Sequence, residues 1–427
     1  MLNLKEDILQ FIWQHKLLKP LPLITTSGKQ IQILKPGELN KDSGPDFFNA
    51  QIKINELILA GNVEVHVKTG DWLKHNHQQD KTYDNLILHV VYEDDKPIRQ
   101  NKDNNVEVLE IKNLVPENLL QNYGSLIESK SSLPCEPQLA DISDLKFSSW
   151  LQRMLIERLE YKVKNMETIF QNVSGNYTQT FYTILLRNFG FKVNSVPFEL
   201  LAKHLPVNTL LKHADNLLSL EALLLGSAGM LEDQFTNKHA LALQNEFEYL
   251  KNKYTIIPLK KELFKFSKLR PANFAPLRLA QFAHLIFLHP ELFQSPQNFN
   301  SFKKIESCLD FQLTGYWKNH YTLDGLATFS DLRLGHDSIS NIITNTFAPF
   351  FFFYFQKTAA SNYGQIPLLL LEASVFEKNA KTKLFSGKKH LFKSAADSQA
   401  LINLHDNFCA RRGCLNCGVA AAILKSH

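Results

Sequence analysis

The sequence lacks the features of a secreted or membrane-bound protein. It has only five cysteines in 427 residues, an odd number that is not typical of a disulfide framework. The first residues, MLNLKEDILQFIWQHKLL, have neither the basic start nor the small-residue cleavage site of a signal peptide. The strongest apolar run, residues 347–355, is too short to span a bilayer and contains Pro349. We therefore expect a cytoplasmic protein with no membrane association.

An excess of charge of one sign is also absent. Lys and Arg total 47 and Asp and Glu total 42, giving a net charge of +5. This balance permits an acidic partner without requiring one, so any nucleic-acid surface must be a local patch. A hydrophobic fraction of 44% is typical of a globular protein. The length exceeds what one hydrophobic core usually serves, and we expect at least two domains.

The N-terminal quarter carries the alternating pattern of β-strands. Apolar and polar residues alternate in six segments, which are 29–34, 49–54, 56–61, 62–68, 85–94 and 105–111. Asn55 and Gly61 separate the middle segments and are predicted to form turns. The pattern predicts a mixed sheet of about five strands with a helix on one face.

Beyond Pro134 the apolar period changes to that of a helix. Apolar residues recur at helical spacing from Phe147 to Phe170, and similar segments follow. We therefore predict an α+β protein with a β-rich domain at 1–115, a linker at 116–145 and a mostly helical domain at 146–427.

Ionisable residues are concentrated between Gly44 and Asp95. Pro45-Asp46 is followed by Glu64, His66 and Lys68, which alternate along one predicted strand and therefore share a face. Two carboxylates beside a lysine suit metal-assisted phosphodiester hydrolysis. The carboxylates hold Mg²⁺ or Mn²⁺, which activates a water molecule, and the lysine stabilises developing charge.

These residues resemble the motif of the PD-(D/E)xK nuclease superfamily. The resemblance implies a nuclease-like fold, with Asp46 and Glu64 as metal ligands and a lysine two residues after the second acid. Here that position is His66, so either His66 replaces the lysine or Lys68 acts from one step further along the strand. The alternative is a non-catalytic nucleic-acid or protein-binding module on a degenerate nuclease-like fold. The whole chain also resembles an uncharacterised bacterial family described only as a domain of unknown function.

A second group of polar residues follows directly. It comprises Asp71, His75, His77, Asp80 and His89. Asp71, His75 and Asp80 could bind a transition metal, and His75 or His77 could act as a general base. The rings of His75 and His77 share one side only if their loop is extended. A metallohydrolase of small substrates is therefore a third hypothesis, and a solvated polar loop is the structural alternative.

Three cysteines lie near the C-terminus. His405, Cys409, Cys414 and Cys417 have the spacing of a zinc site, and Cys135 is an alternative fourth ligand. Three cysteines with a distant fourth are also similar to the iron–sulfur clusters of some nucleases. Buried free thiols are the structural alternative.

Residues 378–393 contain six lysines and no acid. We predict that this segment contacts the phosphate backbone of nucleic acid. A solvated loop is the structural alternative. The candidate residues are Lys381, Lys383, Lys388, Lys389 and Lys393.

Overall fold

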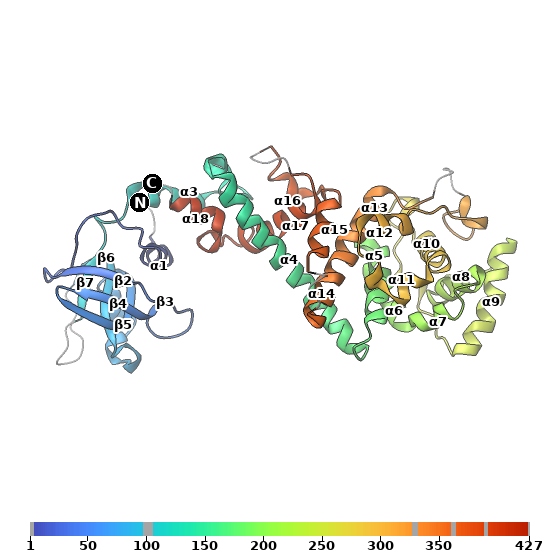
Figure 1. Ribbon diagram of the computed structural model, residues 1–427, viewed down its shortest axis with the longest axis horizontal. Helices are drawn as coiled ribbons and strands as arrows, with labels where there is room; N and C mark the ends of the chain where they lie inside the picture. The colour runs from blue at the N-terminus through green and yellow to red at the C-terminus, as the bar shows by residue number, and fades with distance from the viewer. Residues whose placement is uncertain (1–3, 97–105, 327–331, 360–363, 388–391, 426–427) are drawn as a thin grey trace. The chain divides into compact units, whose positions relative to one another are not determined.

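A computed structural model of the chain describes residues 4–96, 106–326, 332–359, 364–387 and 392–425 (Figure 1). The chain divides into two compact units. Unit 1 comprises Met1–Trp150, Leu384–His390 and Leu404–His427, and unit 2 comprises Leu151–Lys383 and Leu391–Asn403. Unit 1 is therefore assembled from three separate pieces of the sequence.

A seven-stranded sheet forms the centre of unit 1. Its strands are β1 (Leu23–Ile24), β2 (Gln30–Lys35), β3 (Glu38–Leu39), β4 (Phe47–Ile54), β5 (Leu57–Lys68), β6 (Leu86–Glu93) and β7 (Glu107–Glu110). The order is β1-β2-β4-β5-β6-β7, and β3 pairs with β4. Strands β5, β6 and β7 are parallel to one another, whereas the other pairs are antiparallel. The prediction of a mixed sheet is confirmed.

One of the two predicted turns within the sheet is wrong. Asn55 does form the β4–β5 turn, in a left-handed conformation with φ of 53°. Gly61 instead lies inside the continuous strand β5, opposite Ala50. A Cβ at Gly61 would lie 2.5 Å from Ile87 Cγ2 and 2.6 Å from the Asn85 carbonyl oxygen. The glycine therefore permits a close approach of neighbouring chain segments rather than a reversal.

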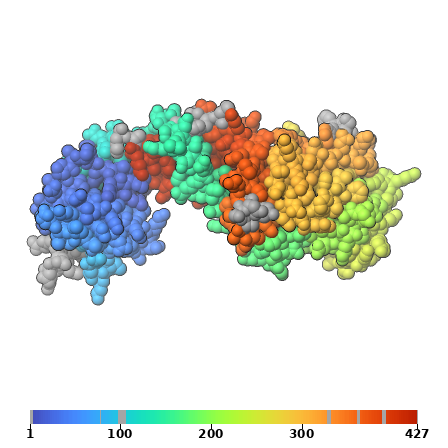
Figure 2. All heavy atoms as spheres, viewed as in Figure 1, coloured from blue at the N-terminus to red at the C-terminus, as the bar shows by residue number. Residues whose placement is uncertain are grey.

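Helix α1 (Glu6–Gln14) packs against the sheet (Figure 1). Ile8, Leu9 and Ile12 are fully buried, and the helix contacts β5 and β3. The apolar face of this amphipathic helix thus turns toward the core. In the space-filling view the residues of this β-rich segment, coloured blue, form one continuous body (Figure 2).

The remaining helices of unit 1 are short. They are α2 (Asp71–Lys74), α3 (Glu117–Glu128) and α18 (Gly418–Leu424), and the first turns of α4 (Asp144–Asn172) also belong to this unit. Helix α18 packs against α3, and Asn122 of α3 donates a hydrogen bond to the carbonyl oxygen of Ile423, which is 301 residues further along the chain. The segment predicted as a linker, 116–145, contains α3 and the 3₁₀ helix η3 (Glu136–Asp141).

Unit 2 is mostly helical, as predicted. Apart from the rest of α4, its helices are α5 (Tyr177–Phe189), α6 (Phe191–His204), α7 (Val207–Leu211), α8 (Leu217–Ser227), α9 (Lys238–Tyr254), α10 (Ala275–Leu288), α11 (Pro290–Gln294), α12 (Phe302–Leu309), α13 (His336–Ile342), α14 (Ala348–Thr358), α15 (Ile366–Ala373), α16 (Ala380–Lys383) and α17 (Ala395–Leu404), whose last residue falls in unit 1. The structure has no β-strand between residues 145 and 300, all of which it describes.

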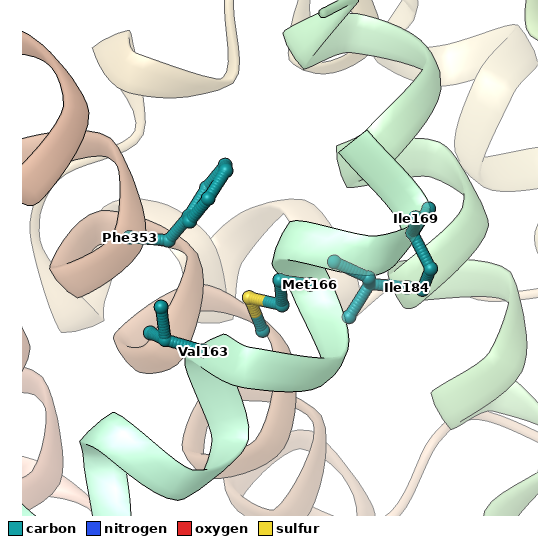
Figure 3. Close-up of a cluster of buried hydrophobic side chains, with 5 residues drawn as sticks. All are labelled: Val163, Met166, Ile169, Ile184 and Phe353. Carbon is teal, nitrogen blue, oxygen red and sulfur yellow. The ribbon is translucent and has the colours of Figure 1, made fainter. Parts of the chain in front are cut away.

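The apolar segment 347–355 belongs to the core of unit 2. Most of it lies on α14, and Phe353 is fully buried. Figure 3 shows Phe353 beside Val163 and Met166 of α4, close to Ile184 of α5. Among the described residues, we find no helix with the length and apolarity needed to cross a membrane.

Candidate functional site

The carboxylates of Asp46 and Glu64 lie next to each other at the start of β4. The backbone N–H of Asp46 donates to Glu64 Oε2 at 3.0 Å, and the N–H of Val65 donates to Asp46 Oδ2 at 3.0 Å. Glu64 is only 4% exposed. The β4–β5 register shifts between Phe47 and Ala50, where Asn49 has φ of 57°. This bulge sits directly beside Asp46, where such irregularities often redirect functional side chains.

Burial of this pair has an electrostatic consequence. Burial raises the pKa of both Asp46 and Glu64. The charge of Asp46 raises the pKa of Glu64 further, and the charge of Glu6 raises both. Without a cation, the pair therefore favours retaining a proton near neutral pH. A divalent cation would displace that proton, because metal binding requires deprotonated carboxylates.

Helix α1 contributes two residues that the sequence analysis did not single out. Gln10 Nε2 donates to Asp46 Oδ1 at 2.8 Å. Glu6 lies one turn earlier on α1, and its charge raises the pKa of Asp46 and of Glu64. The available signal was the spacing of Glu6 and Gln10, which lie at i and i+4 on one face of the predicted amphipathic helix.

Two histidines contact the second carboxylate oxygen of Glu64, and a third lies beside one of them. His66 Nε2 lies 3.4 Å from Glu64 Oε1, and His77 Nε2 lies 3.3 Å from the same oxygen. His66 Nε2 also lies 3.2 Å from His75 Nδ1. One nitrogen from each of these three rings fits within 4.8 Å of the other two. A group of this size and composition could hold a metal ion.

Local backbone geometry brings His75 and His77 to the same side. His75 ends α2 and His77 begins the 3₁₀ helix η1 (His77–Gln79). Asn76 between them has φ of 59°, a left-handed conformation that asparagine tolerates. The expectation that the rings share a side only on an extended loop is therefore wrong, because a helix end with a left-handed residue achieves the same result.

His89 supports the cluster from the neighbouring strand. Parallel pairing places His89 of β6 opposite Glu64 of β5. His89 Nε2 lies 2.8 Å from His66 Nδ1, and His89 is fully buried. This second contact fixes the orientation of the His66 ring, as outer hydrogen bonds commonly do for metal-ligating histidines.

The imidazoles fit the requirements of a metal ligand. Burial lowers the pKa of His66 to about 2, of His77 to about 4 and of His89 to about 3, and nearby imidazoles lower each value further. All three rings are therefore neutral near pH 7, the form that binds metals. His77 Nε2 is buried, and among the described residues it makes no hydrogen bond of good geometry, although Glu64 Oε1 lies 3.3 Å away. Imidazole and carboxylate together suit a transition-metal ion better than Mg²⁺.

The other predicted residues of this region lie at its margin. Lys68 is exposed at the end of β5, and its ammonium contacts neither Asp46 nor Glu64 in the described part of the chain. Asp71 accepts a hydrogen bond from the N–H of Lys68 at 3.0 Å and contacts Lys74 at 2.5 Å. Asp80 is exposed and caps the 3₁₀ helix η2 (Lys81–Tyr83). The structure thus brings together Asp46, Glu64, His66, His75, His77 and His89.

The lysine segment has a mixed environment. Lys383 and Lys393 are exposed and Lys381 is half-buried, whereas Lys388 and Lys389 lie outside the described residues. Phe385 is 1% exposed and therefore belongs to the core rather than to a surface for base stacking.

A protein family described as "Protein of unknown function (DUF2851)" matches residues 6–380. The chain belongs to this family. The match includes the whole Asp46–Glu64 region and ends before the C-terminal cysteines. Neither the curated proteins nor the solved structures provide a match.

Proposed function

We propose that this protein is a metal-dependent phosphodiesterase that cuts nucleic acid, with its site on a nuclease-like fold in unit 1. The observation that carries the proposal is the pairing of Asp46 with Glu64, with His66 on the same strand face two residues further on. Two carboxylates held together in this way provide the oxygen ligands that Mg²⁺ and Mn²⁺ prefer.

Each residue has a defined role in this proposal. Backbone N–H groups donate to Asp46 Oδ2 and to Glu64 Oε2. The other two carboxylate oxygens, Asp46 Oδ1 and Glu64 Oε1, would face the cation. When bound, the cation supplies Lewis-acid activation of the phosphate and of the attacking water. His66 takes the position of the lysine in the resembled motif. His75, which is exposed and next to His66, is placed to accept the proton of the water.

Nucleic acid is the proposed substrate because the chain carries basic residues apart from this site. Lys383 and Lys393 are exposed and would contribute contacts to the phosphate backbone. Such contacts would increase affinity without setting sequence preference.

Two alternatives rest on specific observations. The group of His66, His75 and His77 is typical of transition-metal sites and favours a metallohydrolase of small substrates. The exposed Lys68, displaced from the carboxylates, favours a binding module without catalysis.

A single set of assays separates these proposals. The protein is incubated with single-stranded, duplex and branched DNA, with RNA and with a small phosphodiester, each with Mg²⁺ or Mn²⁺. Cleavage should require a cation and should fall more than about 100-fold in Asp46→Asn and in Glu64→Gln, a larger loss than that of an outer hydrogen bond. Glu56→Gln is the matched control, because Glu56 is a glutamate of the same hairpin whose side chain is 97% exposed.

The outcomes are distinct. Cleavage of the small phosphodiester alone would favour the metallohydrolase. Binding of nucleic acid without cleavage would favour the binding module. Cleavage by Glu64→Gln at the wild-type rate would show that this site does not take part in the reaction.

A further inference from the structure

Four of the five cysteines gather within unit 1. Cys135 precedes η3, Cys409 ends the π-helical turn η10 (His405–Cys409), Cys414 begins the 3₁₀ helix η11 (Cys414–Asn416) and Cys417 precedes α18. Helix α18 contacts both η3 and η11, which brings residue 135 to the C-terminal segment. All four are buried free thiols, exposed by 6–7%. The fifth cysteine, Cys308, lies on α12 of unit 2.

The four thiols share one electrostatic environment. Cys135 interacts electrostatically with Cys417 and Cys414. Cys409 interacts in the same way with Cys135, Cys417 and Cys414. Each sulfur therefore lies within electrostatic reach of the others. Four thiolates could occupy this interior together only with a cationic centre to compensate their charge.

Backbone donors around Cys417 favour a thiolate. The backbone N–H groups of Ala420 and Val419 donate hydrogen bonds to the sulfur of Cys417. N–H donors directed at a cysteine sulfur stabilise its negative form. Hydrogen bonds to the sulfurs are also a feature that tunes metal–thiolate centres.

The spacing of the sulfurs distinguishes between two kinds of centre. Tetrahedral zinc, with Zn–S bonds of about 2.3 Å, would hold all four sulfurs about 3.8 Å apart. No three of these Sγ atoms lie mutually within 4.8 Å, and all four cysteines are among the described residues. A cubane iron–sulfur cluster is several ångströms across and therefore holds its four thiolates further apart than one ion does.

We propose that Cys135, Cys409, Cys414 and Cys417 are the ligands of a four-iron, four-sulfur cluster. His405, the other candidate, has its Nδ1 3.1 Å from the Asp406 carboxylate, and we assign the fourth position to the buried thiol of Cys135. The cluster would connect residue 135 to the C-terminal segment. It would thereby hold together two pieces of unit 1 that are far apart in the sequence. This proposal does not depend on the phosphodiesterase proposal, because the two groups of residues are different.

The test uses the full chain purified without oxygen. Iron, acid-labile sulfide and zinc are measured per chain, and the visible absorption is recorded before and after reduction. We expect about four iron and four sulfide per chain, with visible absorption that decreases on reduction. Cys135→Ser should lose most of the iron. Cys308→Ser, which removes a buried free thiol from unit 2, and His405→Ala should both retain it.

Several results would overturn the proposal. One zinc per chain without iron would indicate a different centre. Wild-type protein that is folded and still binds no iron after anaerobic incubation with ferrous ion and sulfide would show that no cluster forms. Equal loss of iron in His405→Ala and Cys135→Ser would refute the ligand assignment. If Cys135→Ser does not fold, the iron, sulfide and absorption of the wild type still decide whether a cluster is present.

Discussion

The backbone N–H of Asp46 donates to Glu64 Oε2, 3.0 Å away, and so ties one acid to the other. The neighbouring N–H of Val65 donates in return to Asp46 Oδ2. Each carboxylate therefore uses one oxygen to connect the start of β4 to β5. The other oxygens face Gln10, for Asp46, and the histidines, for Glu64. One arrangement thus serves both the fold and the candidate site.

His66 and Lys68 are expected to have very different effects on cation binding. His66 contacts Glu64 and is 1% exposed, whereas the ammonium of Lys68 contacts neither carboxylate in the described part of the chain. His66→Gln should weaken Mn²⁺ binding by at least about 10-fold, as measured by calorimetry. Lys68→Ala, the control on the same strand face, should change binding by less than about 2-fold. A larger loss of Mn²⁺ affinity in Lys68→Ala would indicate that Lys68 does belong to the cation site.

The stability of the metal-free protein should decrease between about pH 7 and pH 9, where the folded state still holds the Glu64 proton that the unfolded chain has released. The folded state keeps Asp46 and Glu64 protonated at pH values where the unfolded chain, with ordinary carboxyl pKa values of about 4, has released those protons. Their contribution is therefore complete below pH 4 and is lost as the pH rises through the raised values. Above about pH 7 the histidines are neutral in both the folded and the unfolded state, so they do not contribute to the change of stability with pH.

Chemical denaturation with a chelator present, at several pH values, measures this effect. The stability of Glu64→Gln should decrease less steeply with pH than that of the wild type, because the variant lacks one of the two coupled carboxyls. Saturating Mn²⁺ should stabilise the wild type increasingly as the pH rises, because the cation replaces the proton. Parallel curves for the wild type and Glu64→Gln would contradict the coupling.

Gln10 is expected to position Asp46. Its amide donates to Asp46 Oδ1 at 2.8 Å, so Gln10→Ala should weaken Mn²⁺ binding by about 10-fold while the protein remains folded. Gln14, one turn further along α1, makes no hydrogen bond to Asp46 or Glu64 within the described residues, and Gln14→Ala is the control. Equal affinities in the two variants would show that α1 does not organise the site.

Gly61 should be intolerant of any side chain. Gly61→Ala would place a Cβ 2.6 Å from the carbonyl oxygen of Asn85, which is a backbone atom and cannot rotate away. We expect a loss of about 1–3 kcal/mol in the free energy of unfolding. Gly335→Ala is the control, because a Cβ there meets no atom within 4 Å and φ is −64°. Equal stability of the two variants would disprove the crowding at β5.

The sequence predicted the mixed sheet and the mostly helical region because both depend on local apolar periodicity. The resemblance to the nuclease motif also grouped Asp46 with Glu64, but the turn predicted at Gly61 divided β5 and so missed its continuous pairing with β4. The contributions of Glu6 and Gln10 could not be predicted in the same way. They depend on how a helix lies across a sheet, and periodicity does not fix that placement.

The histidine cluster shows a second limit of sequence reasoning. His89 reaches His66 through the parallel pairing of β5 and β6, two strands that are not joined by a hairpin. Asn76 turns His75 and His77 to one side through a backbone conformation that many residues disfavour. Neither feature produces a periodic pattern of residues in the sequence.

The three-piece construction of unit 1 bears on the order of synthesis. A ribosome completes all of unit 2 before it reaches Leu404, and unit 1 at that point still lacks its third piece. Domains commonly fold during synthesis at about 5–20 residues per second. The β-rich unit must therefore wait many seconds for α18 and three of its cysteines. A nascent chain stalled before residue 404 should contain a folded helical unit and an N-terminal unit that is still sensitive to protease.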